Sequence, residues 1–337
     1  MKKKVLAVAG IMAAAAALGL YLFAGRGSGG GAPVVVKLVP QPDQPRVSPQ
    51  EAGIDAVALD EAVAYAADRN SRALVVVHGG HVAFEKYWGD TRFDSPVETG
   101  FEPVLLALAM DTALNDRLVH SLDEPLSNYI EEAGPPQNAY TLRSLLARDD
   151  PRVSLEDATD LLAWVLERVT AQPYQTLVAQ RLWMPMGGGA LEFHAGAGRF
   201  RRQGVSAACC LRARLGDWMR VGELLANDGV FEGNQLMPPH YADLMMKPAH
   251  RQSARGYFTR VDGAFAARDV AWLEGSDRQR LWIVPSLRLA ILRLGEEPSA
   301  QKGWDESMIP NAIIRGTRGW HPAGAGEGVD PNRFAPH

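Results

Sequence analysis

Cysteine is nearly absent from this sequence: Cys209 and Cys210 are the only two in 337 residues. Two adjacent cysteines close no useful loop, since a disulfide between them removes little conformational entropy from the unfolded chain. They also fall short of the four ligands of a structural zinc site. We therefore expect two buried free thiols, with no disulfide framework, metal or cofactor.

An excess of one charge is also lacking. The chain has 35 lysines and arginines against 39 acidic residues, a net charge of -4. The charges are interspersed, and pairs such as Arg201-Arg202 are typical of solvated loops. A nucleic-acid-binding surface needs a basic patch or stripe, so the composition excludes nucleic acid as a partner.

Long hydrophobic runs are missing except near the N-terminus, where residues 5–25 are apolar and follow three lysines. As a helix this run spans about 30 Å, the thickness of the hydrocarbon core. A cleaved signal peptide is the alternative, but the run is long for one and no small-x-small site closes it. The positive-inside rule then predicts a cytoplasmic stub over 1–4, a single-pass anchor in the bacterial inner membrane over 5–25 and a periplasmic remainder.

After the anchor the composition changes twice. Residues 26–48 are rich in glycine and then proline, which predicts a flexible and then extended linker that holds the domain off the bilayer. We expect the folded domain over 49–320 and a flexible, Gly/Pro-rich tail over 321–337. The chain is long enough for one large domain with its own core.

Apolar periodicity predicts strands near both ends of the domain, with most of the helices between them. Strands are expected in a hairpin over 73–88 with its turn at Gly79-Gly80, and in a meander over 270–273, 281–284 and 289–293. Helices are expected over 56–66, 103–114, 155–171, 174–183 and 211–228. The fold class is therefore α/β (α+β): an antiparallel sheet with strands from both chain ends, flanked by helices, with a helical insertion.

The order of several segments resembles the class C β-lactamase-related serine hydrolases, which include penicillin-binding-protein-like enzymes. The matching segments are the hairpin 73–88, Ser121-Leu-Asp-Glu-Pro125, Tyr140-Thr-Leu-Arg-Ser-Leu-Leu146, Leu166-Glu-Arg-Val-Thr-Ala-Gln-Pro-Tyr174, Arg181-Leu-Trp-Met-Pro-Met-Gly187, Cys210-Leu-Arg-Ala-Arg-Leu-Gly-Asp-Trp218 and Ile283-Val-Pro-Ser286. The resemblance covers about residues 49–320. It implies the β-lactamase/transpeptidase-like fold.

Members of that family acylate a serine at the start of a buried helix, with a lysine three residues later. Residues i and i+3 share a helix face, and the helix N-terminus favours the developing anion. Counted from the Ser121-Leu-Asp123 landmark, the serine position holds Gly100 and the lysine position holds Pro103. Glycine offers nothing to acylate and proline offers no base, although proline suits the first position of a helix.

The family's other two motifs are altered as well. The expected tyrosine falls on Ser154 and its companion asparagine on Glu156. The third motif falls at 273–275, where Gly275 and Gln279 fit but the usual basic or imidazole residue is missing. Because all three motifs are altered, the sequence indicates that acyl transfer is no longer maintained by selection.

A shift of one residue gives another interpretation, in which Thr99 is a nucleophile and Glu102 its base. A carboxylate is a weak base unless its pKa is raised, and we favour Thr99 as an ordinary helix N-cap over Thr99 as a nucleophile. Ser299 and Lys302 form the only Ser-x-x-Lys in the chain and fall in a polar loop after the last strand. His78 and His81 flank the hairpin turn and have no further ligands to make a metal site.

Six acidic residues fall near the former cleft if the family's topology holds: Glu102, Asp149, Asp150, Glu156, Glu274 and Asp277. They could form a pocket for a cationic ligand or a metal. The favoured interpretation is that they are solvated surface charges around a disused groove.

The sequence thus predicts a membrane-anchored, periplasmic pseudoenzyme that binds a small molecule, a cell-envelope ligand or a partner, with no partner protein identified. One alternative is a residual hydrolase of esters, amides or β-lactams that uses Thr99 or an activated water. The other is a scaffold protein of the envelope.

Overall fold

The computed structural model describes residues 22–23, 32–196, 198–201, 203–251 and 253–322. The predicted stub over 1–4, almost all of the predicted anchor and nearly all of the predicted tail lie outside these residues. Within them, none of the helices has the length and hydropathy of a membrane span.

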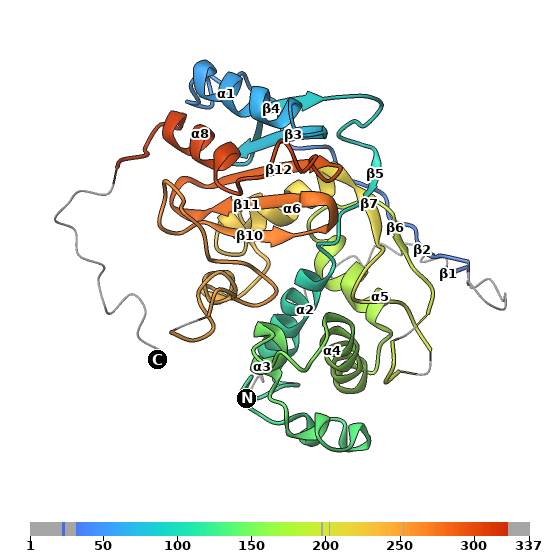
Figure 1. Ribbon diagram of the computed structural model, residues 1–337. Coiled ribbons are helices and arrows are strands. Elements are labelled where there is room, and N and C mark those ends of the chain that lie inside the picture. Colours follow the sequence, from blue (N-terminus) through green and yellow to red (C-terminus); the bar gives the residue numbers. More distant parts are fainter. Residues whose placement is uncertain (1–21, 24–31, 197, 202, 252, 323–337) are drawn as a thin grey trace, which may run out of the picture.

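The centre of the molecule is an antiparallel sheet in the order β10-β11-β12-β3-β4 (Figure 1). Its strands are β3 (Ser71–His78), β4 (His81–Tyr87), β10 (Ala271–Glu274), β11 (Arg280–Val284) and β12 (Leu289–Gly295). The hairpin near the start of the domain joins the meander near its end, since Val76 lies opposite Ile291. The predicted strands and fold class are confirmed.

Side chains of each strand alternate between two apolar layers. Leu74 and Val76 pack with α1 (Ala56–Ala67) and α8 (Met308–Gly316), whereas Val75 and Val77 face the other core. Figure 1 shows α1 and α8 on one side of the sheet and α6 (Leu215–Ala226) on the other. α8 is a helix not predicted from the sequence, and its first turn contains a proline at residue 310.

A helical region follows β5 in the chain and packs beside the second core. It consists of α2 (Pro103–Asn115), α3 (Leu142–Ala147), α4 (Leu155–Thr170), α5 (Tyr174–Val178) with a π-helical turn at Ala179–Trp183, and α7 (Tyr241–Met245). Every residue of α2 from Pro103 to Met110 is buried, which explains the uniformly apolar sequence of this stretch. The predicted helices are confirmed, except that residues 212–214 of the last one form a strand.

A second, smaller sheet has the order β1-β2-β6-β7-β5. Its strands are β1 (Leu22–Phe23), β2 (Val34–Val36), β5 (Pro96–Glu98), β6 (Leu191–Phe193) and β7 (Arg212–Arg214), and a separate hairpin joins β8 (Val230–Phe231) to β9 (Asn234–Gln235). These short strands have too few residues for a periodicity to show.

The prediction of a linker over 26–48 is wrong for residues 34–47, which are part of the folded domain. Val36 is fully buried, Gln44 donates a hydrogen bond to Glu223 at 3.1 Å, and Arg46 forms a bridge beside Val82. The prolines do hold this segment extended, but the three consecutive valines of β2 pair with β6 and tie it to the domain. Over these residues the segment is part of the fold and not a spacer.

The prediction of buried free thiols is wrong. Cys209 and Cys210 form a disulfide with a Cα–Cα distance of 3.7 Å, and Cys209 is exposed. Cys210 has a left-handed backbone with φ of 71°. The entropy argument shows only that such a bond adds little stability, and it does not exclude the bond.

Candidate functional site

Gly100, at the family's serine position, lies in the turn between β5 and α2. Its φ is +79°, and α2 begins only at Pro103, so Gly100 is outside the helix. A Cβ atom built on Gly100 lies 3.0 Å from the Cα atom of Gly275 and 3.2 Å from the backbone nitrogen of Ser276. A serine side chain at this position therefore meets the backbone of the third motif.

The contact between Gly100 and Gly275 is also tight when it is measured from Gly275. A Cβ atom built on Gly275 lies 1.8 Å from the carbonyl oxygen of Thr99. The structure thus brings the first and third motif positions together, as the resemblance implies. They meet backbone to backbone, with no room between them for a nucleophile and a substrate carbonyl.

The other residues of the first motif are buried and have structural roles. Pro103 is the first residue of α2, as its residue type favours. Thr99 is fully buried and its Oγ1 accepts a hydrogen bond from the Phe101 N–H at 3.2 Å. The N-cap of α2 is Glu102, so the expectation that Thr99 caps this helix is wrong.

Glu102 is 2 % exposed and faces the protein interior. Its Oε1 accepts a hydrogen bond from the Leu211 N–H at 3.0 Å, whereas its Oε2 is buried without a partner among the described residues. Burial raises the pKa of this carboxyl to about 7. A protonated Oε2 therefore fits this environment better than a charged one at and below neutral pH.

The second motif is occupied by a helix cap. Ser154 is exposed, is the N-cap of α4 and accepts a hydrogen bond from the Asp157 N–H at 3.0 Å. Glu156 is exposed in the first turn of α4, where a carboxylate is favourable to the helix dipole. Neither residue has the surroundings of a proton relay.

The third motif carries an ion-pair network in place of the family's basic group. Glu274, at the end of β10, lies 3.5 Å from Arg260 and 3.9 Å from Arg255. Arg260 also pairs with Asp262. An acidic side chain paired with arginines therefore occupies the position where the resemblance implies a basic or imidazole residue.

The six acidic residues do not form one pocket for a metal. Asp149 lies 3.4 Å from His250, Asp150 pairs with Arg152, and Glu102 is buried apart from them. Across the part of the chain that is described, no group of three or more histidine, cysteine or acidic side chains could hold a metal ion. The interpretation as separately paired and solvated charges fits better.

The remaining predicted positions have ordinary contacts. His78 Nδ1 lies 2.7 Å from the carbonyl oxygen of Ala52, and His81 Nδ1 lies 3.1 Å from that of Gly79. Lys302 pairs with Asp68 and not with Ser299. None of these residues forms a catalytic arrangement.

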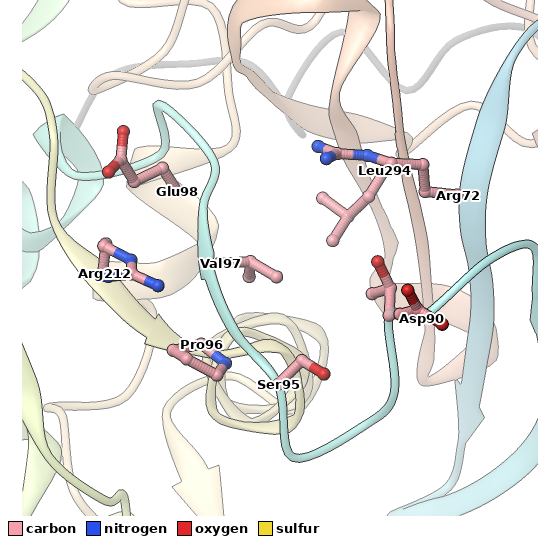
Figure 2. Close-up of a pocket in the computed structure, with 9 residues that line it drawn as sticks. Arg72, Asp90, Ser95, Pro96, Val97, Glu98, Arg212 and Leu294 are labelled. Carbon is pink, nitrogen blue, oxygen red and sulfur yellow. The ribbon is translucent and has the colours of Figure 1, made fainter.

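The described residues also form two pockets, and the lining of the smaller one includes Glu156 of the second motif. The larger, of about 480 Å³, is formed where the two sheets meet and is drawn in Figure 2. It is lined by Arg72, Asp90, Thr91, Ser95, Pro96, Val97, Glu98, Arg212 and Leu294. Sequence reasoning missed it because these residues come from separate strands and loops, and no motif spans them.

The smaller pocket, of about 210 Å³, is next to a loop that α4 holds through one buried carboxylate. Asp160 is 2 % exposed and accepts hydrogen bonds from the backbone N–H groups of Gly198, Phe200 and Arg201. Its other contact is an ion pair with the buried Arg201 side chain at 2.7 Å. Asp160, Gly198 and Arg201 also line this pocket.

The architecture, a central antiparallel sheet with helices on both faces and a helical region over its edge, is that of the β-lactamase and penicillin-binding-protein-like serine hydrolases. The chain is similar to a Bacillus anthracis structure provisionally described as a 6-aminohexanoate-dimer hydrolase, with a TM-score of 0.65, 17% identity and coverage of 80% of this chain and 87% of that one. It is similar to a Mycobacterium bovis β-lactamase, with a TM-score of 0.58, 14% identity and coverage of 77% and 98%. It is also similar to a class C β-lactamase from Rhodobacter sphaeroides, with a TM-score of 0.55 and 13% identity. That match covers 73% of this chain and 95% of the other.

A sequence relative supports the same relationship. The chain is 24% identical over 213 residues to the 6-aminohexanoate-dimer hydrolase of Paenarthrobacter ureafaciens, covering 59% of this chain and 50% of that protein. It thus spans about half the length of this relative. No family model matches the chain. These comparisons confirm the predicted fold and are consistent with the resemblance to β-lactamase-related serine hydrolases.

Proposed function

We propose that this protein is a non-catalytic β-lactamase-fold protein that binds a ligand or partner and does not hydrolyse it. The contact between Gly100 and Gly275 carries the proposal. With a Cβ on Gly100 only 3.0 Å from the Gly275 Cα, the position of the nucleophile is filled by backbone. Acyl transfer needs a nucleophile with a base in hydrogen-bond reach, and this arrangement supplies neither.

The two other motifs support the same proposal. Ser154 is a helix cap, and Glu274 pairs with arginines where the family has a basic or imidazole residue. Each replacement has a structural role of its own, so these positions are stable parts of the fold without catalysis.

A residual hydrolase is the second candidate, and the observation in its favour is Glu102. A carboxyl whose pKa is raised to about 7 is a competent general base near neutral pH. Against it, Glu102 is buried, and the neighbouring Thr99 hydroxyl is fully enclosed. The Paenarthrobacter relative is named as a hydrolase, which keeps this candidate worth testing.

We also propose that the protein is tethered to the bacterial inner membrane with its folded domain in the periplasm. The three lysines before the apolar run over 5–25 support this orientation. Fusion of a reporter enzyme that is active only after export, placed after residue 322, tests it. An inactive fusion, or a protein that carbonate washing removes from membranes, contradicts it.

The catalytic question is tested by intact-mass analysis after incubation with a fluorophosphonate and, separately, with a penicillin, together with a p-nitrophenyl ester assay. The proposal expects no adduct and no turnover from folded protein. Turnover that Thr99→Ala or Glu102→Gln abolishes, or an adduct mapped to residues 99–103, would establish the hydrolase instead. A penicillin-binding protein with an intact Ser-x-x-Lys motif is the positive control.

A further inference from the structure

The turn that leads into β7 is closed by the disulfide between Cys209 and Cys210. Cys209 is exposed and Cys210 is half-buried. Adjacent residues close no loop in the unfolded chain, so this bond adds little to the stability of the fold. Exposed disulfides are also the ones that a thiolate reaches most readily. The bond can therefore be opened in the folded protein.

The chain is held on both sides of this turn. Before it, the Ser206 hydroxyl accepts a hydrogen bond from the Cys209 N–H at 3.4 Å. After it, Arg212 of β7 lies opposite Glu98 of β5 in the second sheet. The freedom gained when the disulfide opens is therefore concentrated at residues 210–211.

Cys210 has a backbone conformation that the open form does not need to keep. Its φ of 71° lies in the left-handed region, which is unfavourable for a residue with a Cβ atom. The Leu211 N–H belongs to the peptide that follows Cys210, so a rotation at Cys210 reorients this N–H. In the disulfide form the N–H donates to Oε1 of Glu102 at 3.0 Å. Rotation at Cys210 therefore breaks a contact with the first motif.

Glu102 depends on this contact because it is buried at the start of α2. Its side chain is 2 % exposed, and its Oε2 has no hydrogen-bond partner among the described residues. Glu102 is the N-cap of α2, and its carbonyl oxygen accepts the Leu105 N–H at 2.9 Å. A buried polar group that loses its partner is costly. Loss of the Leu211 donor is therefore expected to loosen the first turn of α2.

We propose that Cys209 and Cys210 form a redox-active site that a dithiol opens, and that opening releases the Leu211 N–H from Glu102 and loosens the start of α2. The substrate class of this site is a dithiol, which supplies both electrons. The inference goes beyond the proposed non-catalytic function and does not depend on it.

The exchange proceeds in two balanced steps. One thiolate of the dithiol attacks the exposed Sγ of Cys209, which forms a mixed disulfide and displaces Cys210 as a thiolate. The second thiolate of the dithiol then attacks the reagent's own sulfur in that mixed disulfide and displaces Cys209. The dithiol leaves as a disulfide after giving up two electrons, and its two protons end on the two cysteines.

The first experiment treats the folded full chain with dithiothreitol in the absence of denaturant, followed by an alkylating reagent and intact-mass analysis. We expect no alkylation before reduction and two equivalents after it, one for each cysteine of the disulfide. Circular dichroism and thermal melts confirm that the reduced protein stays folded. Alkylation only after denaturant is added, or alkylation before reduction, overturns the redox site.

The second experiment measures amide hydrogen exchange with and without dithiothreitol, by mass spectrometry of peptides that contain Leu211 or Leu105. Both amides are expected to exchange about tenfold faster after reduction, the effect of one lost hydrogen bond to a carboxylate. The Asp157 amide, which donates to Ser154 at the start of α4, is the matched control and should not change. Equal acceleration at Asp157, or none at Leu105, overturns the coupling to α2.

The double variant Cys209→Ser/Cys210→Ser separates the disulfide from other effects of the reagent. Its Leu211 and Leu105 amides should exchange at the rate of the reduced wild-type protein, with or without dithiothreitol. A variant that still responds to the reagent contradicts the assignment to this pair. Failure of the exchange test leaves the non-catalytic function standing, whereas an acyl adduct overturns that function and leaves this inference untouched.

Discussion

At the scale of single residues, Gly89 and Gly100 have nearly the same φ angle in different surroundings. Their φ angles are +81° and +79°, yet a Cβ on Gly89 meets nothing within 4 Å, whereas one on Gly100 meets the backbone of Gly275. Alanine at either position carries the left-handed backbone cost, about 1–2 kcal/mol. Comparing alanine at the two positions therefore separates the cost of backbone strain from the cost of the contact between residue 100 and the Gly275 backbone.

We expect Gly100→Ala to lower the free energy of unfolding by about 1–3 kcal/mol more than Gly89→Ala, because it adds overpacking to the same strain. Urea denaturation of the two variants measures the difference. Equal losses would mean that the Gly275 backbone moves aside easily and that the catalytic position can reopen.

Glu102 is expected to make stability depend on pH. Its folded-state pKa of about 7 lies above its ordinary value of 4.5, so the folded protein binds the proton more tightly. The contribution of this group is complete below about pH 4.5 and is lost as the pH rises through 7. In Glu102→Gln the decline over this range should shrink by on the order of 2–3 kcal/mol.

Asp111, whose pKa burial also raises to about 7, keeps a similar slope in the same window. The variant profile should therefore be flatter than the wild-type profile and not flat. Denaturation at several pH values measures it, with the exposed Glu61→Gln as the control. An unchanged slope would place the Glu102 carboxyl in contact with water.

At the scale of elements, α4 anchors a loop through Asp160. We expect Asp160→Ala to lower the free energy of unfolding by about 3–5 kcal/mol, since it leaves the buried Arg201 without this partner. Asp157→Ala on the same helix removes only a contact of 3.8 Å to Arg199, and should cost below about 1 kcal/mol. Chemical denaturation of both variants tests the contrast, and similar losses would contradict the anchoring role.

The turn at Cys209-Cys210 leads directly into β7, and its disulfide can be tested by alkylation. Denatured, unreduced protein should take up no alkylating reagent, and protein treated with a dithiol should take up two equivalents. The double variant Cys209→Ser/Cys210→Ser should change stability by no more than about 1 kcal/mol, because adjacent residues close no long loop. Alkylation without reduction would restore the prediction of free thiols.

The elements that sequence could predict are those with long periodic patterns. β3, β4, α2 and α4 follow from alternation or helical spacing, and their positions are confirmed. The three-residue strands β2, β5, β6 and β7 give no period, and β2 falls within a proline-rich segment that reads as a spacer. Their pairing is set by tertiary contacts between distant segments, which one sequence does not display.

The candidate site likewise has parts that the sequence could predict and parts that it could not. Spacing from known motifs located Gly100, Ser154 and Gly275, because the family's order fixes these positions along the chain. The contact between Gly100 and Gly275 depends on a backbone path that only the structure gives. The charged pocket has no motif at all, so the sequence offered no signal for it.

At the scale of the whole molecule, the fold includes residues before 49, because β1 (Leu22–Phe23) and β2 (Val34–Val36) both belong to the second sheet. A chain that starts at residue 49 loses the buried side chains of Val36 and Leu38, each worth about 1.5–3 kcal/mol. It also leaves the Glu223 carboxylate without Gln44. We expect it to be at least about 3 kcal/mol less stable than a chain that starts at residue 32. Thermal and urea unfolding of the two chains would show this, and equal stability would return residues 34–47 to the role of a spacer.

The contact between Gly100 and Gly275 also restricts how this protein can evolve. A serine restored at position 100 would collide with the backbone of residues 275–276, which the carbonyl of Thr99 in turn confines. A single codon change therefore cannot recover the nucleophile, and any path back to hydrolysis passes first through less stable sequences. Under the proposed non-catalytic function, a return to acyl transfer would therefore need a compensating change in the backbone of residues 275–276 as well as the new serine.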